Sequence, residues 1–418
     1  MSADIYDMIV IGGGASGMMA AAVAAEQGAR VLLLEKNDTL GNKLAISGGG
    51  RCNILNAEEN ERLLLTNYGK ADKFLFSAFT QFGMRDTYEY FESRGLKLKV
   101  ENRKRAFPVT DSADDVVRLL RGELSKHNVQ VKTGAEVQSI YAANGEIKYI
   151  KCNGKRVQAR SYVLSTGGMS RPETGSTGDG FEWLKHLGHD VNEPTPNVTP
   201  LAVNDSWVKA VSGVSAKSAD VIFYVDGKRS FKIHGDILIT HFGISGPTVL
   251  NNAYKVAELL EEGSVTAEID CFPAVNEKEL DQSVRAAIEE HPTKQIKNTL
   301  RFIVPDGLNK AITKLLKGQI DLETKNSELN RASRQQIVKL LKAMPLTIDR
   351  LMGFERAVVA DGGLSLRDID TRTMKSRKIS NLYVTGDLLD INRPSGGYSL
   401  QLCWTTGYLA GSSGSKGG

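Results

Sequence analysis

Three glycines near the start of the chain have the spacing of a phosphate-binding turn. Gly12, Gly14 and Gly17 form a G-x-G-x-x-G pattern, and Glu35 follows in the sequence. In such a turn the first glycine permits the sharp bend, the second lets a pyrophosphate approach the backbone, and the third lets a helix pack closely on a strand. An acid about 20 residues further on hydrogen-bonds a ribose. The pattern therefore predicts a dinucleotide site.

A second glycine cluster suggests which dinucleotide it is. Gly48, Gly49 and Gly50 are consecutive, with Lys43 before them and Arg51 after them. Three successive glycines do not stabilise a helix or a strand, because glycine loses the most backbone entropy on folding. They suit a backbone pressed against a flat or anionic ligand, which favours a flavin. The alternative interpretation is a flexible, solvated loop.

Near the C-terminus, a predicted strand is again followed by glycines and a helix. Residues 381–384 (NLYV) are predicted to form a strand that ends at Gly386-Asp387, and Gly396-Gly397-Tyr398 then leads into a helix over residues 399–410. Asp387 is expected to accept a hydrogen bond from a ribitol chain. The positive end of the helix is expected near N1 and O2 of a flavin, where it stabilises the reduced ring. Both ends of the chain should therefore build one domain.

Elements of the first domain are predicted as a strand over residues 5–11, a helix over 18–27 and a strand over 30–34, a complete βαβ unit. Two later segments are expected to return to the cofactor, a strand at Val137 and the turn at Thr166-Gly167. Each has a plain connecting segment as its alternative.

The middle of the chain has a different pattern. Strands are expected from about residue 199 to 233, with a turn at Asp226-Gly227, and apolar residues at three- and four-residue spacing predict helices between 277 and 344. The predicted fold class is α/β, a Rossmann-like domain built from both chain ends with an inserted β domain that itself carries a helical domain. The predicted boundaries are 1–193 and 351–418 for the first domain, 194–275 and 338–350 for the β domain, and 276–337 for the helical domain.

Composition narrows the class of protein. The 418 residues are 41% hydrophobic and 24% charged, with a net charge of +4, so a nucleic-acid partner is not expected. The four cysteines have no metal-ligand spacing, and no metal is predicted. We find no signal peptide and no apolar run of the roughly 20 residues that a membrane span needs. The expected location is the cytoplasm, without a membrane partner.

These segments resemble a known family. The stretches IGGGASGMMAA, LLEKNDTLGNKLAISGGGRCN, TGGMSRPETGSTGDG, THFGISGP and SGGYSLQ look like the three-domain bacterial FAD-dependent oxidoreductases, which include aminoacetone oxidase-like and dehydro-bile-acid reductase-like proteins. The resemblance extends from Asp7 to about Gly411. It departs from the family at Asn42, often arginine, at Asp387, often glutamate, and at Arg393, often a smaller residue.

The resemblance implies FAD as cofactor. The residues expected to contact or frame it are Gly12, Gly14, Ala15, Ser16, Gly17, Glu35, Lys36, Lys43, Gly49, Gly50, Arg51, Val137, Gly167, Asp387, Gly397 and Tyr398. The same loops add Ser47, Cys52, Thr166, Gly386 and Gly396. Tyr398 and His241 are the candidate catalytic residues, each with a structural role in packing or hydrogen bonding as its alternative.

The flavin performs hydride transfer at N5, and the sequence contains one dinucleotide fingerprint. A second, NAD(P)H-binding domain is therefore not expected, and two mechanisms remain. We favour a reductase of a small enone-like substrate, with NAD(P)H as a transient electron donor. An amine oxidase that uses O2, with an aminoacetone-like substrate, is one alternative. A flavin-dependent RNA-modifying protein, for which Arg103–Arg105 and Lys375–Lys378 supply basic runs, and a non-catalytic FAD-binding protein are the others.

Overall fold

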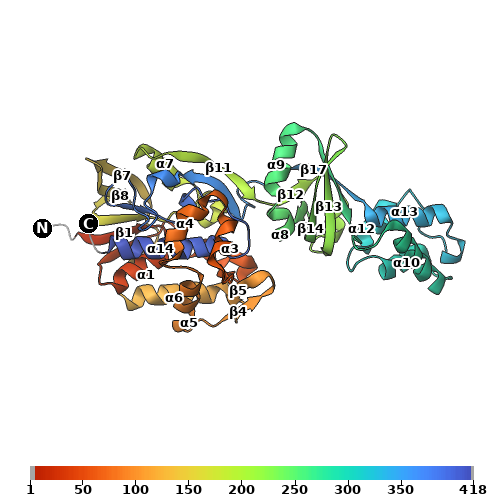
Figure 1. Ribbon diagram of the computed structural model, residues 1–418, viewed down its shortest axis with the longest axis horizontal. Coiled ribbons are helices and arrows are strands. Elements are labelled where there is room, and N and C mark those ends of the chain that lie inside the picture. Colours follow the sequence, from red (N-terminus) through yellow and green to blue (C-terminus); the bar gives the residue numbers. More distant parts are fainter. Residues whose placement is uncertain (1–4, 416–418) are drawn as a thin grey trace. The chain divides into compact units, whose positions relative to one another are not determined.

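The computed structural model describes residues 5–415 and divides into two compact units. One contains the chain up to Pro196 together with the chain from Ala357 onward, and the other is Asn197–Arg356 (Figure 1). The first unit is thus discontinuous in sequence, and the second is an insertion into it.

A five-stranded parallel sheet forms the centre of the first unit. Its strands, in spatial order, are β19 (Leu382–Val384), β10 (Ala159–Leu164), β1 (Tyr6–Ile11), β2 (Val31–Leu34) and β6 (Gln130–Lys132). Met8–Ile11 and the whole of β2 are buried. Unbroken apolar runs are typical of parallel strands that are covered on both faces. The predicted strands over 5–11, 30–34 and 381–384 are confirmed within a residue or two.

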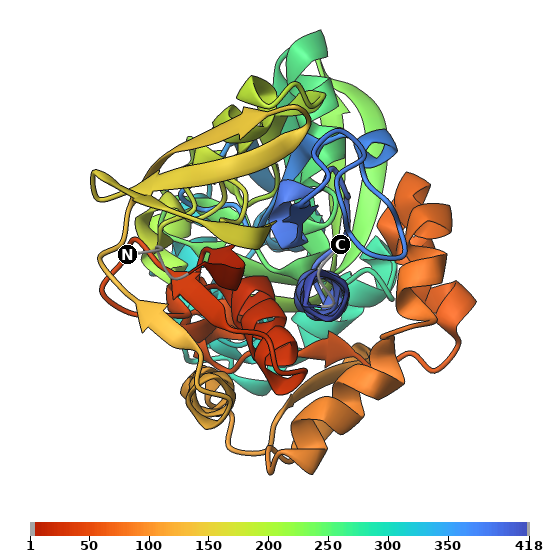
Figure 2. The ribbon, with the colours of Figure 1, turned by 90° about the vertical axis from the view of Figure 1, so that its left-hand side faces the viewer.

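Two helices from opposite ends of the chain pack side by side on this sheet. They are α1 (Ala15–Glu26) and α14 (Tyr398–Gly414). In Figure 2, α14 is dark blue and seen almost end-on beside the red α1. The side chain that alanine would add at Gly407 or Gly411 comes within 2.5 Å of Ser16 O or 2.4 Å of Ala20 O, respectively. The two helices are therefore in backbone contact through glycine.

Other helices and small sheets complete the first unit. The helices are α2 (Asn42–Ala45), α3 (Glu61–Leu65), α4 (Asp72–Phe79), α5 (Met84–Ser93), α6 (Ala113–Lys126) and α7 (Asp179–His186). The small sheets are β3 (Leu55–Asn56), β5 (Arg105–Pro108) and β4 (Leu98–Glu101); β7 (Val137–Ala143), β8 (Glu146–Cys152) and β9 (Lys155–Val157); and the pair β11 (Val191–Val198) and β18 (Val359–Leu364).

The second unit is built on a closed six-stranded barrel. Its strands, in order around the barrel, are β12 (Leu201–Val203), β15 (Gly243–Ser245), β14 (Lys228–Thr240), β13 (Ser215–Val225), β16 (Val265–Asp270) and β17 (Met344–Leu351). The predicted turn at Asp226-Gly227 is confirmed: it joins β13 to β14, and both residues have positive φ, of 47° and 76°. That is the two-residue hairpin turn that Asp-Gly favours.

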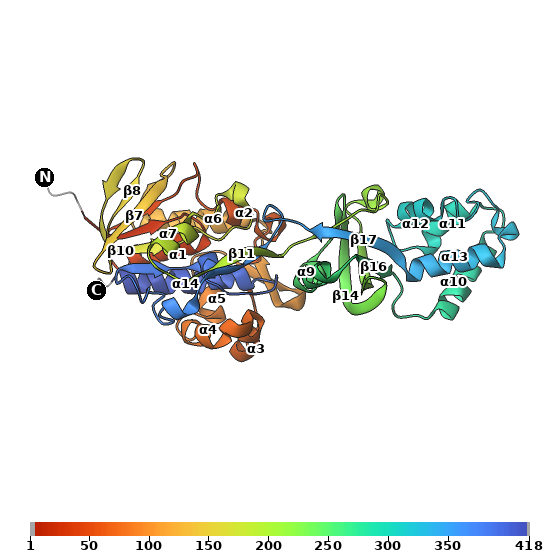
Figure 3. The same ribbon diagram turned by 90° about the horizontal axis from the view of Figure 1, so that it is seen from above.

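Helices α8 (Pro247–Leu250) and α9 (Ala253–Glu262) lie against the barrel. Four more gather at one of its ends, α10 (Glu277–Glu290), α11 (Ile296–Ile303), α12 (Asn309–Leu316) and α13 (Arg331–Lys342) (Figure 3). A single hydrophobic core runs from the barrel into these helices. The fold class predicted from the sequence is confirmed, whereas the division of the insertion into separate β and helical domains stays a prediction.

Candidate functional site

The first glycine loop joins β1 to α1 at the carboxyl edge of the sheet. Gly12 has φ +105°, and a Cβ there would lie 2.5 Å from Ser165 O. A Cβ at Gly17 would lie 1.9 Å from Gly12 O, so neither position accepts a side chain. At Gly14 a Cβ would meet no protein atom within 4 Å. The loop is therefore closed on its protein side and open at the one glycine where a ligand was predicted to approach.

Helix α1 begins beside this opening. Gly14 is the N-cap of α1, with no side-chain cap, and Gly12, Gly14 and Ala15 keep partly exposed surface. The first N–H groups of a helix have no partner within the helix, and they carry the positive end of its dipole. Such an end binds phosphate. Ser16 and Gly17, which are buried, hold the first turn in place.

Glu35 lies under the same loop. Its Oε2 accepts a hydrogen bond from Gly13 N (2.7 Å), and its Oε1 accepts one from Asn37 N (2.8 Å). The carboxylate retains further lone pairs for a ribose. Its own carbonyl accepts from Ala135 N, which brings the segment before Val137 to the end of β2. The neighbouring Lys36 turns away: its Nζ lies 2.7 Å from Asp179 Oδ2.

The second glycine loop is mostly exposed. Gly48, Gly49 and Gly50 all have positive φ, of 57°, 69° and 86°, and a Cβ at Gly49 or Gly50 would meet nothing within 4 Å. Ser47 closes the turn by donating from Oγ to Leu44 O (2.7 Å). Cys52 is fully buried, and burial raises its pKa to about 12. Cys52 therefore supports the loop from within, and its contact with a cofactor stays a prediction.

The two cations of this region have different environments. Arg51 Nη2 lies 2.5 Å from both Glu101 Oε1 and Asp111 Oδ1, and its guanidinium stacks over Phe107. Its charge is therefore already compensated, which the sequence did not reveal. Lys43 instead points to Asp387, at 3.9 Å. Burial lowers the pKa of Lys43, and Asp387 acts in the opposite direction.

Asp387 belongs to a compact charged group at the end of β19. Arg393 donates to it and to Ile391 O (2.6 Å), and its side chain is 1% exposed. Burial opposes ionisation of Asp387, but Arg393 and Lys43 outweigh this effect and lower its pKa. Cys403 lies beside the group, where burial and Asp387 raise its pKa to about 12. Asp387 is thus a fixed, ionised acceptor, as a hydrogen bond from a ribitol chain requires.

The start of α14 is held by its neighbours. A Cβ at Gly397, the N-cap, would lie 2.3 Å from the Leu55 carbonyl carbon. Asn56 Nδ2 donates to Gly396 O (3.1 Å), and Tyr68 Oη donates to Tyr398 O (2.9 Å). The rings of Tyr68 and Tyr398 meet edge to face. Tyr398 is therefore anchored through its backbone, with part of its side chain exposed.

The remaining predicted residues follow the ends of strands β10 and β19. Thr166 Oγ1 is buried and has no hydrogen-bond partner among residues 5–415. Gly167 has φ +73°, and a Cβ there would lie 2.8 Å from Ser176 Oγ. Gly386, at the end of β19, has φ +63°, and a Cβ there would lie 3.0 Å from Ser16 Oγ. The ends of β10 and β19 thus meet the start of α1.

His241 belongs to the second unit. It is exposed, between β14 and β15, and its ring contacts Phe242. Its predicted catalytic role stays a prediction.

These features fit a dinucleotide with a flavin ring. The open glycine, the uncapped helix end, the buried carboxylate, the unsatisfied hydroxyl and the fixed Asp387 all lie at the edge where open α/β sheets bind ligands.

Comparison with known proteins agrees with this geometry. A family model described as "HI0933-like protein Rossmann domain" matches residues 6–413. The chain belongs to this HI0933-like family. The resemblance noted in the sequence is confirmed, and the chain is an FAD-dependent oxidoreductase.

Two curated relatives of this HI0933-like protein match over almost their full length. The 3-dehydro-bile acid delta(4,6)-reductase of Clostridium scindens is 31% identical, over 96% of this chain and 97% of the relative. The ribosomal RNA dihydrouridine synthase of Escherichia coli is 28% identical, over 96% of each chain. Among solved structures, 3-ketosteroid-delta4-(5alpha)-dehydrogenase from Rhodococcus jostii has a TM-score of 0.57 at 15% identity, covering 99% of this chain and 97% of that one. At that identity the likeness concerns the fold.

Several residues of the site were missed from the sequence. Ser165, Asn53 and Tyr68 shape the loops through backbone contacts, and Cys403 lies beside Asp387. With its amide oriented to satisfy its neighbours, Asn53 accepts a hydrogen bond from Gly397 N (2.9 Å). Of these residues, only Asn53 could have been found from the sequence, because it stands next to the glycine cluster.

Within residues 5–415, no helix has the length and apolar character that a membrane span requires.

Proposed function

We propose that the chain is an NAD(P)H-dependent reductase of carbon–carbon double bonds conjugated to a carbonyl. The observation that carries this proposal is the pair of full-length relatives named above. A delta-4 bond of a 3-dehydro bile acid is conjugated to its C3 carbonyl, and the bond reduced in uridine is conjugated to its C4 carbonyl. The two names thus share one reaction class on very different molecules.

The residues of this chain supply binding and electrostatics for that reaction. The N-terminus of α1 would hold the diphosphate of FAD, and Asp387, fixed by Arg393, would accept a hydrogen bond from the ribitol. The N-terminus of α14, with its positive dipole end, would stabilise negative charge on the flavin ring. Bound FAD supplies the hydride, from N5.

Tyr398 is the proposed proton donor to the substrate carbon next to the carbonyl. It is the first residue of α14, and its backbone is fixed by Tyr68. Burial, followed by the charge of Glu58, raises the pKa of Tyr398. Its hydroxyl therefore stays protonated at neutral pH, as a general acid must be.

Anaerobic stopped-flow absorbance tests the direction of the reaction. The purified flavoprotein is mixed with NADH, NADPH or aminoacetone, and bleaching of the flavin is followed. We expect rapid bleaching by a reduced nicotinamide and recovery of the oxidised spectrum on adding a conjugated enone. Bleaching by aminoacetone alone would contradict the proposal in favour of an amine oxidase, and a flavin inert to all three would leave a non-catalytic FAD-binding protein.

Substitution of Tyr398 tests the proton donor. Tyr398→Phe should lower turnover of the enone by about 10²-fold or more, the usual contribution of a general acid. Flavin reduction by NAD(P)H should be unchanged, because the hydroxyl takes no part in it. Equal turnover in the variant and the parent would contradict this role.

A second candidate acceptor is a uracil base in RNA. It is favoured by the match to the Escherichia coli relative and by a second relative of the same name from Haemophilus influenzae, 26% identical over 96% of this chain. Mass-spectrometric detection of dihydrouridine after incubation of reduced enzyme with unmodified RNA tests it.

A further inference from the structure

An exposed aromatic side chain stands among cations at the end of α11. Phe302 is 50% exposed. Lys294 Nζ lies 4.8 Å and Arg301 Cζ 4.7 Å from its ring centroid, and the ring of His291 lies 4.7 Å away, tilted by 45°. We call His291, Lys294, Arg301 and Phe302 the aromatic platform. Phe302 is outside the hydrophobic core, so its ring is accessible to a ligand.

The two cations of the platform have no acidic partner among the residues that the structure describes. Within residues 5–415, Lys294 and Arg301 take part in no ion pair. Other cations of these helices do, in the pairs Arg285–Glu289, Arg334–Asp281 and Lys297–Glu323. The two basic runs noted in the sequence are also partly compensated, through Lys104–Glu58 and Lys378–Asp368. The platform therefore combines an exposed ring with two cations whose charges no carboxylate among the described residues compensates.

A buried residue connects the two segments that carry the platform. Asn326 is 3% exposed, and its Nδ2 donates to His291 O (2.8 Å) and to Thr299 Oγ1 (2.7 Å). These bonds tie the segment before α11 to α11 itself.

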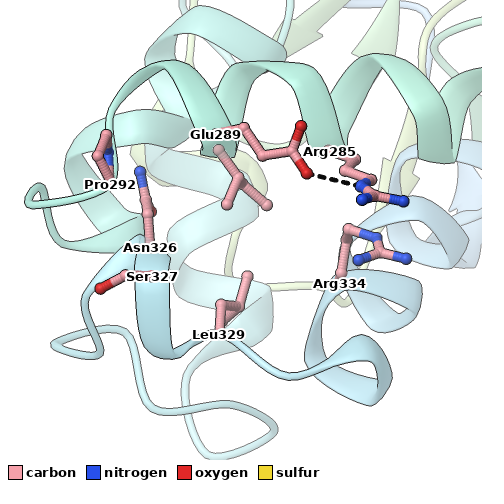
Figure 4. Close-up of a pocket in the computed structure, with 8 residues that line it drawn as sticks. Arg285, Glu289, Pro292, Asn326, Ser327, Leu329 and Arg334 are labelled. Carbon is pink, nitrogen blue, oxygen red and sulfur yellow. Dashed lines mark hydrogen bonds and ion pairs between the residues drawn. The ribbon is translucent and has the colours of Figure 1, made fainter.

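A cavity of about 360 Å³ borders the same segment through Pro292 and Asn326 (Figure 4). Arg285 and Arg334 line it, and each is paired with a carboxylate. The cavity therefore carries no surplus charge, and these arginines offer a contrast with the platform.

The surplus charge of the chain is concentrated in these helices. Residues 276–343 contain 13 lysines and arginines against 9 aspartates and glutamates. Their net charge of +4 equals that of the whole chain, so the remaining residues are balanced. The helical region thus attracts polyanions, which the average charge of the chain did not indicate.

We propose that the aromatic platform binds single-stranded RNA. Bases stack on exposed aromatic rings and on guanidinium planes, while unpaired cations contact the phosphates. The platform supplies all three in one place. The choice of RNA over DNA rests on the proposed function, for which a uracil base is a candidate acceptor. For this region, the proposal departs from the expectation, based on composition, that the protein has no nucleic-acid partner.

Fluorescence anisotropy with a labelled 20-nucleotide RNA of mixed sequence tests the proposal on the intact flavoprotein. Phe302→Ala should weaken binding about tenfold, because one stacked base is lost. Phe302→Trp should restore it. The double variant Lys294→Gln/Arg301→Gln should lower the slope of log affinity against log salt by about 1.4, for two phosphates released from single-stranded contacts. Arg285→Gln is the matched control and should bind as the parent does.

This experiment measures RNA binding and not turnover, so its result is independent of whether the chain reduces an enone. Absence of RNA binding by the parent, or equal binding by Phe302→Ala and Arg285→Gln, overturns the proposal. Tighter binding of the same sequence as DNA overturns the choice of RNA. A loss of self-association in Phe302→Ala by analytical ultracentrifugation, with RNA affinity unchanged, would assign the platform to an interface between copies instead.

Discussion

Two glycine loops flank the candidate site, and they use glycine for different reasons. In the first, Gly12 and Gly17 are required because a Cβ would collide with backbone atoms, whereas Gly14 is surrounded by open space. In the second, Gly49 and Gly50 meet no neighbour, and glycine is required for their positive φ. One loop is a packed junction with a single opening. The other is an exposed turn.

The environment of each glycine predicts which property a substitution there will change. A collision with backbone cannot be relieved by rotating a side chain, so it concerns folding. An open position with ordinary φ concerns the ligand alone. A positive φ costs only the strain of placing an L-residue there. Substitutions should therefore separate folding, binding and local strain at neighbouring positions.

The largest effect is expected at Gly17. Gly17→Val should destabilise the protein by about 4 kcal/mol or more, since the added Cβ would lie 1.9 Å from Gly12 O. The yield of soluble protein and the free energy of unfolding in urea measure it. Gly122→Ala, in α6 with open space around it, is the control and should be neutral or stabilising by up to about 1 kcal/mol. A stable, flavin-loaded Gly17→Val protein would show that the loop relaxes freely.

Gly14 should separate binding from folding. Its φ of −79° and ψ of −168° are available to any residue, and its surroundings are empty. Gly14→Val should therefore fold with an unchanged circular dichroism spectrum but lose FAD, because the side chain fills the space that the diphosphate needs. The ratio of flavin to protein measures the loss. A normal ratio would place the diphosphate elsewhere.

A substitution at Gly49 should lower the free energy of unfolding only through backbone strain. Gly49→Ala places an L-residue at φ +69°, which costs about 1–2 kcal/mol of the free energy of unfolding. Gly49→Asn should cost less, because asparagine tolerates this conformation. Equal losses for alanine and asparagine would indicate that something other than φ sets the cost.

The smallest effect is expected at Arg51 and depends on pH. The pKa of Glu101 is lowered first by its hydrogen bond from Arg51, and that of Asp111 by Lys99 and then by Arg51. A carboxylate with a lowered folded pKa stabilises the fold above its unfolded pKa of about 4 and loses that contribution as pH falls through the folded value. Arg51→Gln should therefore reduce the acid-side drop in Tm. The measurement is Tm from roughly pH 7 to pH 3, and parallel curves for parent and variant would contradict it.

Much of the fold and part of the site could be predicted from the sequence. The strand–turn–helix around Gly12 and the final strand and helix around Gly397 were predicted because buried parallel strands are continuous apolar runs and glycines punctuate them. The aromatic platform was missed, because Phe302 follows Arg301 in an ordinary amphipathic pattern. Its exposure depends on how α11 packs, which no local pattern records.

Residue types and their local spacing were enough to predict where turns and helices begin and where a diphosphate-binding loop lies. Only the tertiary structure decided how charges pair. It placed Arg393 on Asp387 and compensated Arg51 with two acids, whereas Lys294 and Arg301 have no acid beside them among residues 5–415. The physical reason is that ion pairs join residues distant in the chain, so their partners are set by packing.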